Sequence, residues 1–136
     1  MFEILEHPSD VGILARGSDR QEALLELSRG LVSIIVSTEG IEPTEEREFR
    51  ADGSDDEAQI VNWLNEILFF FDTEGFVPVD LRITSWNNHM LIGRARGVFF
   101  DPARHEFRTA VKAATYHQFA SRPVSGEWEI RAFVDV

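Results

Sequence analysis

Apolar and polar positions alternate with two different periods along the 136-residue chain, and the change of period separates predicted strands from predicted helices. Residues 2–6 and 11–16 have the two-residue period of short strands. Pro8 interrupts the two runs, because proline lacks a backbone N–H and restricts the preceding residue to extended conformations. The sequence therefore predicts a fixed bend or bulge here, from which the carboxylate of Asp10 can be aimed.

Two longer segments have apolar residues at helical spacing, from Ser18 to Val36 and from Ser54 to Gly75. Each begins with Ser followed three residues later by Gln or Glu, which is the spacing of a capping box. Gly75 is expected to end the second helix, since glycine adopts the left-handed conformation common after a last helical turn. Each apolar stripe needs a sheet, or the other helix, to cover it.

The two-residue period returns after Gly75, and tight turns such as Asn87-Asn88 and Pro123 to Gly126 separate the runs. The pattern predicts an α+β fold: a single domain over residues 1–136, with a mostly antiparallel sheet and two main helices packed on one face. Besides the first two, strands are predicted at residues 47–51, 79–83, 90–95, 110–119 and 128–136.

Composition narrows the class of protein. A chain of this length with 43% hydrophobic residues can bury one core. The net charge of −11 opposes direct, strong nucleic-acid binding, because such binding rests on Lys and Arg neutralising phosphates. The absence of cysteine excludes disulfides and thiolate sites. With no basic apolar leader and no apolar run of about 18 residues, a membrane span is not expected, and the cytoplasm is the expected location.

Asp10 and Asp135 are the candidate metal ligands. If the first and last strands are neighbours, the bend at Asp10 faces the end of the strand that carries Asp135, and the terminal carboxylate of Val136 adds a third anionic group. Three hard oxygen donors suit calcium or magnesium, which would offset their repulsion. The alternative is that an aspartate near the terminus is simply solvated.

Lys112 is the one lysine beside twelve arginines. A lysine is a compact point charge and is not equivalent to the planar arginine fork, so Lys112 is a candidate functional residue, although chance also explains a single lysine. The four histidines lack the spacing of a helical metal site. For His7 and His117 a structural role in orienting a loop is favoured over catalysis.

Several motifs, in order, resemble those of the archease family. Residues 7–12, His-Pro-Ser-Asp-Val-Gly, are similar to its His-Thr-Ala-Asp-hydrophobic-Gly signature. The segments at residues 62–66, 71–75, 100–106, 111–117 and 133–136 match in the same order. Two departures are Pro8-Ser9 in place of Thr-Ala, and Thr109-Ala110 where an acidic residue is common. Neither departure removes a proposed ligand.

The resemblance implies a non-catalytic, metal-binding accessory protein that activates an RtcB-type RNA ligase in tRNA splicing and RNA repair. Such proteins promote guanylylation of the ligase, repeated turnover and use of a wider range of nucleotides. The implied metal site, usually assigned to calcium, falls on Asp10, Asp135 and Val136. Lys112 and His7 are the expected partner-facing residues.

Two alternatives remain open at this point. The first is a chaperone or specificity modulator of a tRNA-modifying enzyme such as a methyltransferase. The second is a metal-dependent phosphoesterase with Asp10, His7 and Asp135 at its centre, which lacks the usual array of closely spaced His and Asp ligands.

Overall fold

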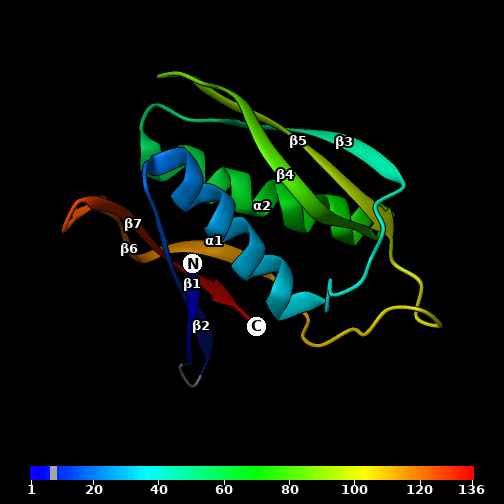
Figure 1. The fold of residues 1–136 in the computed structure, drawn as a ribbon. Helices are drawn as coiled ribbons and strands as arrows, with labels where there is room; N and C mark the ends of the chain where they lie inside the picture. Colours follow the sequence, from blue (N-terminus) through cyan, green and yellow to red (C-terminus); the bar gives the residue numbers. More distant parts are fainter. Residues whose placement is uncertain (7–8) are drawn as a thin grey trace.

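The fold has two antiparallel sheets with two helices between them, as a computed structural model of the chain shows (Figure 1). The structure describes residues 1–6 and 9–136. The first sheet has the strand order β1-β2-β7-β6 and the second the order β3-β5-β4. In chain order the elements are β1 (Phe2–Glu6), β2 (Asp10–Gly17), α1 (Arg20–Ile35), β3 (Glu45–Asp52), α2 (Asp56–Glu74), β4 (Phe76–Trp86), β5 (Met90–Phe99), β6 (Ala113–Val124) and β7 (Glu127–Asp135).

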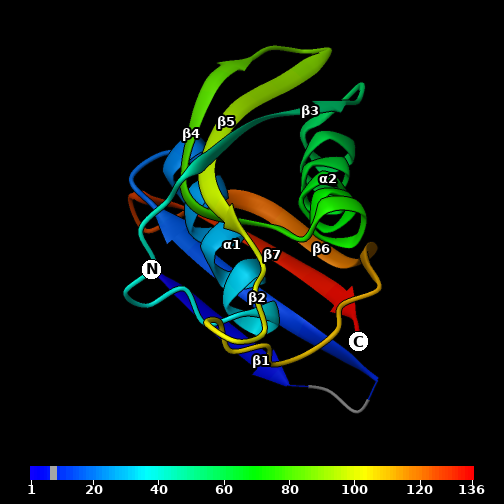
Figure 2. The same cartoon turned by 90° about the vertical axis from the view of Figure 1, so that its right-hand side faces the viewer.

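The helices join the two sheets into one core. Helix α1 packs mainly on β2 and β7, whereas α2 packs on β6 and also on β3 (Figure 2). The buried cluster draws on both sheets and both helices. The predicted α+β class, with antiparallel strands and two main helices, is confirmed. The division into two sheets was not predicted, and it covers the apolar helices from two sides.

Both helices begin one residue later than the capping boxes predict. The caps are Asp19 and Asp55, not Ser18 and Ser54. Each aspartate side chain accepts, at 2.8 Å, the backbone N–H of the residue three positions later in the chain. A carboxylate at this position also interacts favourably with the positive end of the helix dipole. Gly75 ends α2 with φ 70°, as predicted.

The strand pairing corrects two expectations. The last strand, β7, does not pair with the first strand, β1. Strand β2 lies between them and pairs with both. The strand predicted at 110–119 begins at Ala113 and continues through Pro123 to Val124. Proline is tolerated there because β6 is an edge strand, where an N–H is not needed on the open side. Among the described residues, no helix is long and apolar enough to span a membrane.

Candidate functional site

Asp10 and Asp135 lie directly opposite each other at one end of the four-stranded sheet. They are the first cross-strand pair of β2 and β7, and Val136 follows immediately. Side chains of directly opposed residues share a face of the sheet, so the two carboxylates are neighbours. We call Asp10, Asp135 and Val136 the acidic corner. Two of its three predicted members are therefore brought together by strand register.

The acidic corner is on the face of the sheet that points away from α1. Ala132 and Val134 of β7 are buried on the helix side, and the alternation of a strand puts Phe133 and Asp135 on the other. Gly12 lies opposite Phe133, and a Cβ at position 12 would be only 2.8 Å from its Cε1 atom. The glycine two residues after Asp10 thus lets this ring lie against β2.

Lys112 adjoins the acidic corner through its backbone. Its N–H donates to the carbonyl oxygen of Asp135 at 2.8 Å, and the next residue, Ala113, is the cross-strand partner of Asp135. Val111 is buried and Lys112 is exposed, and both residues precede β6. Within the described part of the chain the Lys112 ammonium makes no ion pair. It is available to a ligand or a partner.

Asn65 of α2 holds the strand that carries Lys112. Its side-chain oxygen accepts the N–H of Ala114 at 2.8 Å, and its side-chain nitrogen donates to the Ala114 carbonyl at 3.4 Å. This two-way amide contact mimics one rung of a sheet and fixes the beginning of β6. Ala114 follows Ala113, which is the cross-strand partner of Asp135. Ala114 and Ala113 therefore connect the motif at residues 62–66 to the acidic corner.

Next to Asn65, Glu66 faces the other sheet. Its carboxylate accepts the backbone N–H of Arg50 in β3 at 3.4 Å. Partial burial raises the pKa of Glu66, and the hydrogen bond from Arg50 lowers it by less. The carboxylate is thus held between α2 and the three-stranded sheet.

His117 lies on an irregularity of β6. Thr115 pairs with Phe133 and Ala120 pairs with Arg131, so four residues of β6 oppose one residue of β7. The ring of His117 packs edge-on against Phe133, with centroids 6.0 Å apart. This contact fits the structural role favoured by the sequence. His7 lies outside the described residues, and its predicted partner-facing role stays a prediction.

The acidic corner offers few protein ligands for a cation. Among residues 1–6 and 9–136 there is no group of three or more His, Cys, Asp or Glu side chains placed to hold a metal ion. Two opposed carboxylates and an oxygen of Val136 fit a hard cation chemically, but calcium takes six to eight oxygen ligands. A bound ion would keep several positions for water or for oxygens of another molecule.

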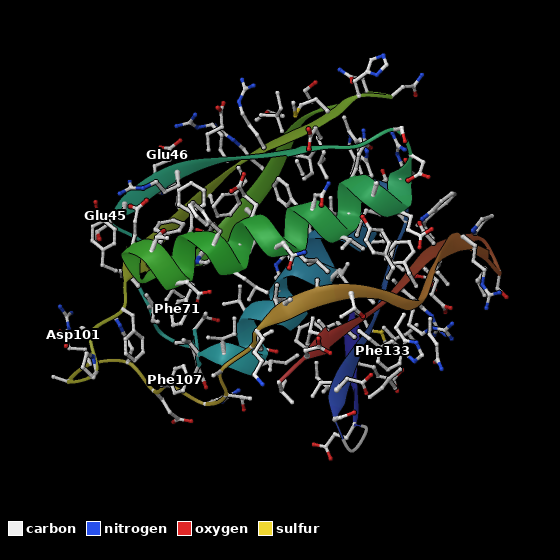
Figure 3. The ribbon with its side chains drawn as sticks, turned by 180° about the vertical axis from the view of Figure 1, so that it is seen from behind. Glu45, Glu46, Phe71, Asp101, Phe107 and Phe133 are labelled. Carbon is white, nitrogen blue, oxygen red and sulfur yellow. The ribbon has the colours of Figure 1, made fainter. Side chains whose placement is uncertain are left out.

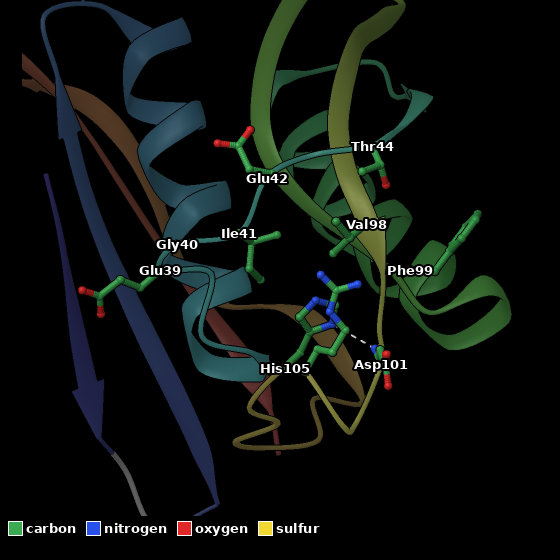
Figure 4. Close-up of a pocket in the computed structure, with 10 residues that line it drawn as sticks. Glu39, Gly40, Ile41, Glu42, Thr44, Val98, Phe99, Asp101 and His105 are labelled. Atoms are coloured by element: carbon green, nitrogen blue, oxygen red, sulfur yellow. Dashed lines mark hydrogen bonds between the residues drawn. The ribbon is translucent and has the colours of Figure 1, made fainter.

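Away from the acidic corner, a hollow of about 470 Å³ lies between the loop before β3 and the segment after β5 (Figure 4). Its lining includes Asp101, Arg104 and His105 of the motif at 100–106, but no member of the acidic corner. The Nδ1 atom of His105 accepts the backbone N–H of Asp101 at 2.9 Å. The resemblance to the archease family includes this motif but implies no role for it. In the structure, the motif forms a loop that lines this hollow and is separate from the acidic corner.

Aromatic packing fixes that loop against α2. The rings of Phe71 and Phe107 are nearly parallel, with centroids 6.4 Å apart (Figure 3). The ring of Phe100 meets both of them edge-on. The segment that leads from β5 to Lys112 is therefore anchored on the end of α2.

Comparisons with known proteins agree in length and in fold. The sequence profile of the Archease protein family (MTH1598/TM1083) matches residues 2–136. Protein archease of Sulfurisphaera tokodaii is 35% identical over 139 residues, covering 98% of this chain and 96% of that protein. Protein archease of Sulfolobus acidocaldarius is 32% identical over 136 residues, covering 99% and 98%.

Two solved structures share the fold. The solution structure of Methanobacterium thermoautotrophicum protein 1598 has a TM-score of 0.83 and 28% identity, covering 99% of this chain and 98% of that one. The crystal structure of an archease, described as a possible chaperone, from Thermotoga maritima has a TM-score of 0.59 and 22% identity, covering 100% and 98%. The match over residues 2–136 and the identity to curated relatives lead to one conclusion: this chain belongs to the archease family.

Proposed function

We propose that this protein is a cytoplasmic, metal-binding accessory factor that activates an RtcB-type RNA ligase, and that the acidic corner is its working site. The observation that carries the proposal is the direct opposition of Asp10 and Asp135. Like charges directly opposite each other destabilise a sheet, and a divalent cation between them would reverse the sign of that interaction. Membership of the archease family supports the choice of partner.

In this proposal the cation is calcium, or another hard divalent ion, held by Asp10, Asp135 and an oxygen of Val136. Because the chain offers so few ligands, the ion keeps positions that oxygens of the ligase or of its nucleotide can occupy. Lys112, beside Asp135, adds a positive charge that can meet a phosphate. The accessory protein positions charge, and the ligase makes the bond.

The test is to measure guanylylation and multiple turnover of a purified RtcB-type ligase with the wild-type protein and with Asp10→Asn, Asp135→Asn and Lys112→Met. Asp72→Asn is the matched control, since the Asp72 side chain is exposed on α2 and makes no hydrogen bond or ion pair within the described residues. We expect the three corner variants to lose stimulation and the control to keep it. Normal stimulation by all three folded variants would falsify the proposal.

A second candidate function is a chaperone or specificity modulator of a tRNA-modifying enzyme such as a methyltransferase. It is favoured only by the description of the Thermotoga maritima relative as a possible chaperone. Adding this protein to a purified tRNA methyltransferase, in parallel with the ligase assay, separates the two. Stimulation of the methyltransferase alone would replace the first proposal by the second.

A further inference from the structure

The outer face of the three-stranded sheet is open to solvent. Both helices contact the inner face, where Leu81 and Ala95 are buried, and no described element covers the other face. A hollow of about 230 Å³ opens on this sheet. Three arginines and two carboxylates line it together with Leu81: Glu46, Asp80, Arg82, Arg94 and Arg96.

Register places two of these arginines directly opposite each other. Arg82 of β4 is the cross-strand partner of Arg94 of β5, whereas Arg96 lies between Asp80 and Glu46. Two like charges in direct opposition are unfavourable in a sheet. The pair therefore needs negative charge near it.

Glu46 forms an ion pair with one member of the pair, Arg94, which Glu48 on the same strand also approaches at 3.9 Å. The Nε atom of Arg94 donates to the Glu46 carboxylate, and this hydrogen bond with the charge of Arg94 lowers the pKa of Glu46. Arg82 and Arg96 lower that pKa further, which puts their charges near the same carboxylate. Yet within the described part of the chain the guanidinium groups of Arg82 and Arg96 make no hydrogen bond or ion pair.

We propose that this outer face is a docking surface for an acidic segment of a partner protein, whose Asp or Glu side chains bind Arg82 and Arg96. The planar guanidinium fork matches a carboxylate with two parallel N–H···O bonds. The hollow supplies the space for such a group beside the strands. The inference is independent of the acidic corner and goes beyond the proposed activation of a ligase.

The charge pattern favours a protein carboxylate over a nucleic-acid backbone. Nucleic-acid affinity grows with the number of phosphates that Lys and Arg neutralise, and a chain with net charge −11 repels a long polyanion. The two carboxylates that line the hollow leave one surplus positive charge. A short acidic segment of a protein suits this surplus, and a run of phosphates does not.

The docking surface is also separate from the acidic corner. In Figures 1 and 2 the sheet of β3, β5 and β4 lies at the top, and the C-terminus, beside Asp135, lies near the bottom. The two views are related by a rotation about the vertical axis, and the vertical separation of the two surfaces is the same in each. Substitutions at one surface can therefore be made without touching the other.

The experiment titrates the full chain into a fluorescently labelled hexaglutamate peptide and follows anisotropy at 50 and 200 mM NaCl. Arg82→Gln is compared with Arg122→Gln, because both arginines are exposed and neither has an ion pair within the described residues. We expect peptide binding that weakens with salt, at least about fivefold weaker binding for Arg82→Gln, and less than twofold for Arg122→Gln. Arg82→Glu should weaken binding further.

Three outcomes would overturn the proposal. One is equal loss of binding in the Arg82 and Arg122 variants, which would mean that only net charge matters. Another is displacement of the peptide by a mixed-sequence RNA oligonucleotide at a lower concentration than unlabelled hexaglutamate. The last is displacement by inorganic phosphate at a lower concentration than glutarate. Circular dichroism of each variant ensures that it is folded.

Discussion

The two sheets each contain a pair of like charges in direct opposition, but they treat the pair differently. In the three-stranded sheet, Arg94 faces Arg82 on one side and receives the carboxylate of Glu46 from the other side, so a third strand supplies the missing charge. In the four-stranded sheet, Asp10 faces Asp135, and the strand beyond Asp135 places uncharged Ala113 beside it.

This difference indicates which of the two like-charged pairs is stabilised within its own sheet and which would be stabilised by a bound ligand. A carboxylate from a third strand stabilises the arginine pair at any ligand concentration, whereas a bound cation would stabilise the aspartate pair only when that cation is present. The acidic corner is therefore expected to respond to metal ions, and the arginine pair is expected to respond to pH and to acidic partners.

The largest expected effect comes from the helix contact that holds the acidic corner in place. Asn65→Ala removes both hydrogen bonds to Ala114, and leaving partly buried backbone groups unpaired should cost about 1–3 kcal/mol of unfolding free energy. Calcium affinity should fall as well, while hexaglutamate binding stays unchanged. Urea denaturation and calorimetric titration measure the two quantities.

The control for this change is Asn62→Ala. The Asn62 amide donates to the Asp52 carbonyl at 2.8 Å, at an exposed end of the three-stranded sheet. It should leave calcium affinity intact. If both variants lose calcium equally, the acidic corner does not depend specifically on the beginning of β6.

A smaller effect is expected from the acidic corner itself. Asp135→Asn should weaken calcium binding at least about tenfold, which is about 1.4 kcal/mol. Without calcium the same change should raise the unfolding free energy by roughly 0.2–1 kcal/mol, because it removes the repulsion from Asp10. Thermal melts in EGTA and in calcium chloride should therefore rank the two proteins in opposite orders. The same order in both solutions would contradict a cation at this site.

The smallest effect is expected from the carboxylate that compensates the arginine pair. Glu46→Gln should lower the melting temperature at neutral pH by no more than about 2 °C, since the ion pair is exposed. The pKa of Glu46 is lowered in the folded protein, so the folded state favours the charged form. Its stabilisation is complete above the ordinary pKa of a glutamate and is lost as pH falls through the lowered value.

Melting curves from neutral to strongly acidic pH measure this contribution. The difference between wild type and Glu46→Gln should shrink on acidification and vanish once Glu46 is protonated. A difference that stays constant with pH would show that Glu46 acts through packing and not through charge.

The sequence allowed prediction of the acidic corner but not of the arginine pair. Asp10 and Asp135 stand at the ends of their strands, so neighbouring strands are enough to bring them together, although the neighbour proved to be the second strand. Opposition of Arg82 and Arg94 depends on the register shift between Ile83 and Ser85, which lies between this pair and the hairpin turn. Each irregularity of one residue moves side chains to the other face, and periodicity does not reveal its position.

For the same reason, the division of the strands into two sheets could not be predicted. The period of two identifies strands, but it does not say which strands pair. The predicted helix boundaries agree with the observed ones within two residues. The error arose because a serine was taken as the N-cap, whereas the aspartate that follows it caps the helix.

Asn65 and Glu66 also have a mechanical consequence. Successive residues of a helix point about 100° apart, and here one contacts Ala114 in the first sheet while the next contacts Arg50 in the second. A sliding shear of one sheet past the other would break at least one of these contacts. Helix α2 therefore resists shear between the sheets.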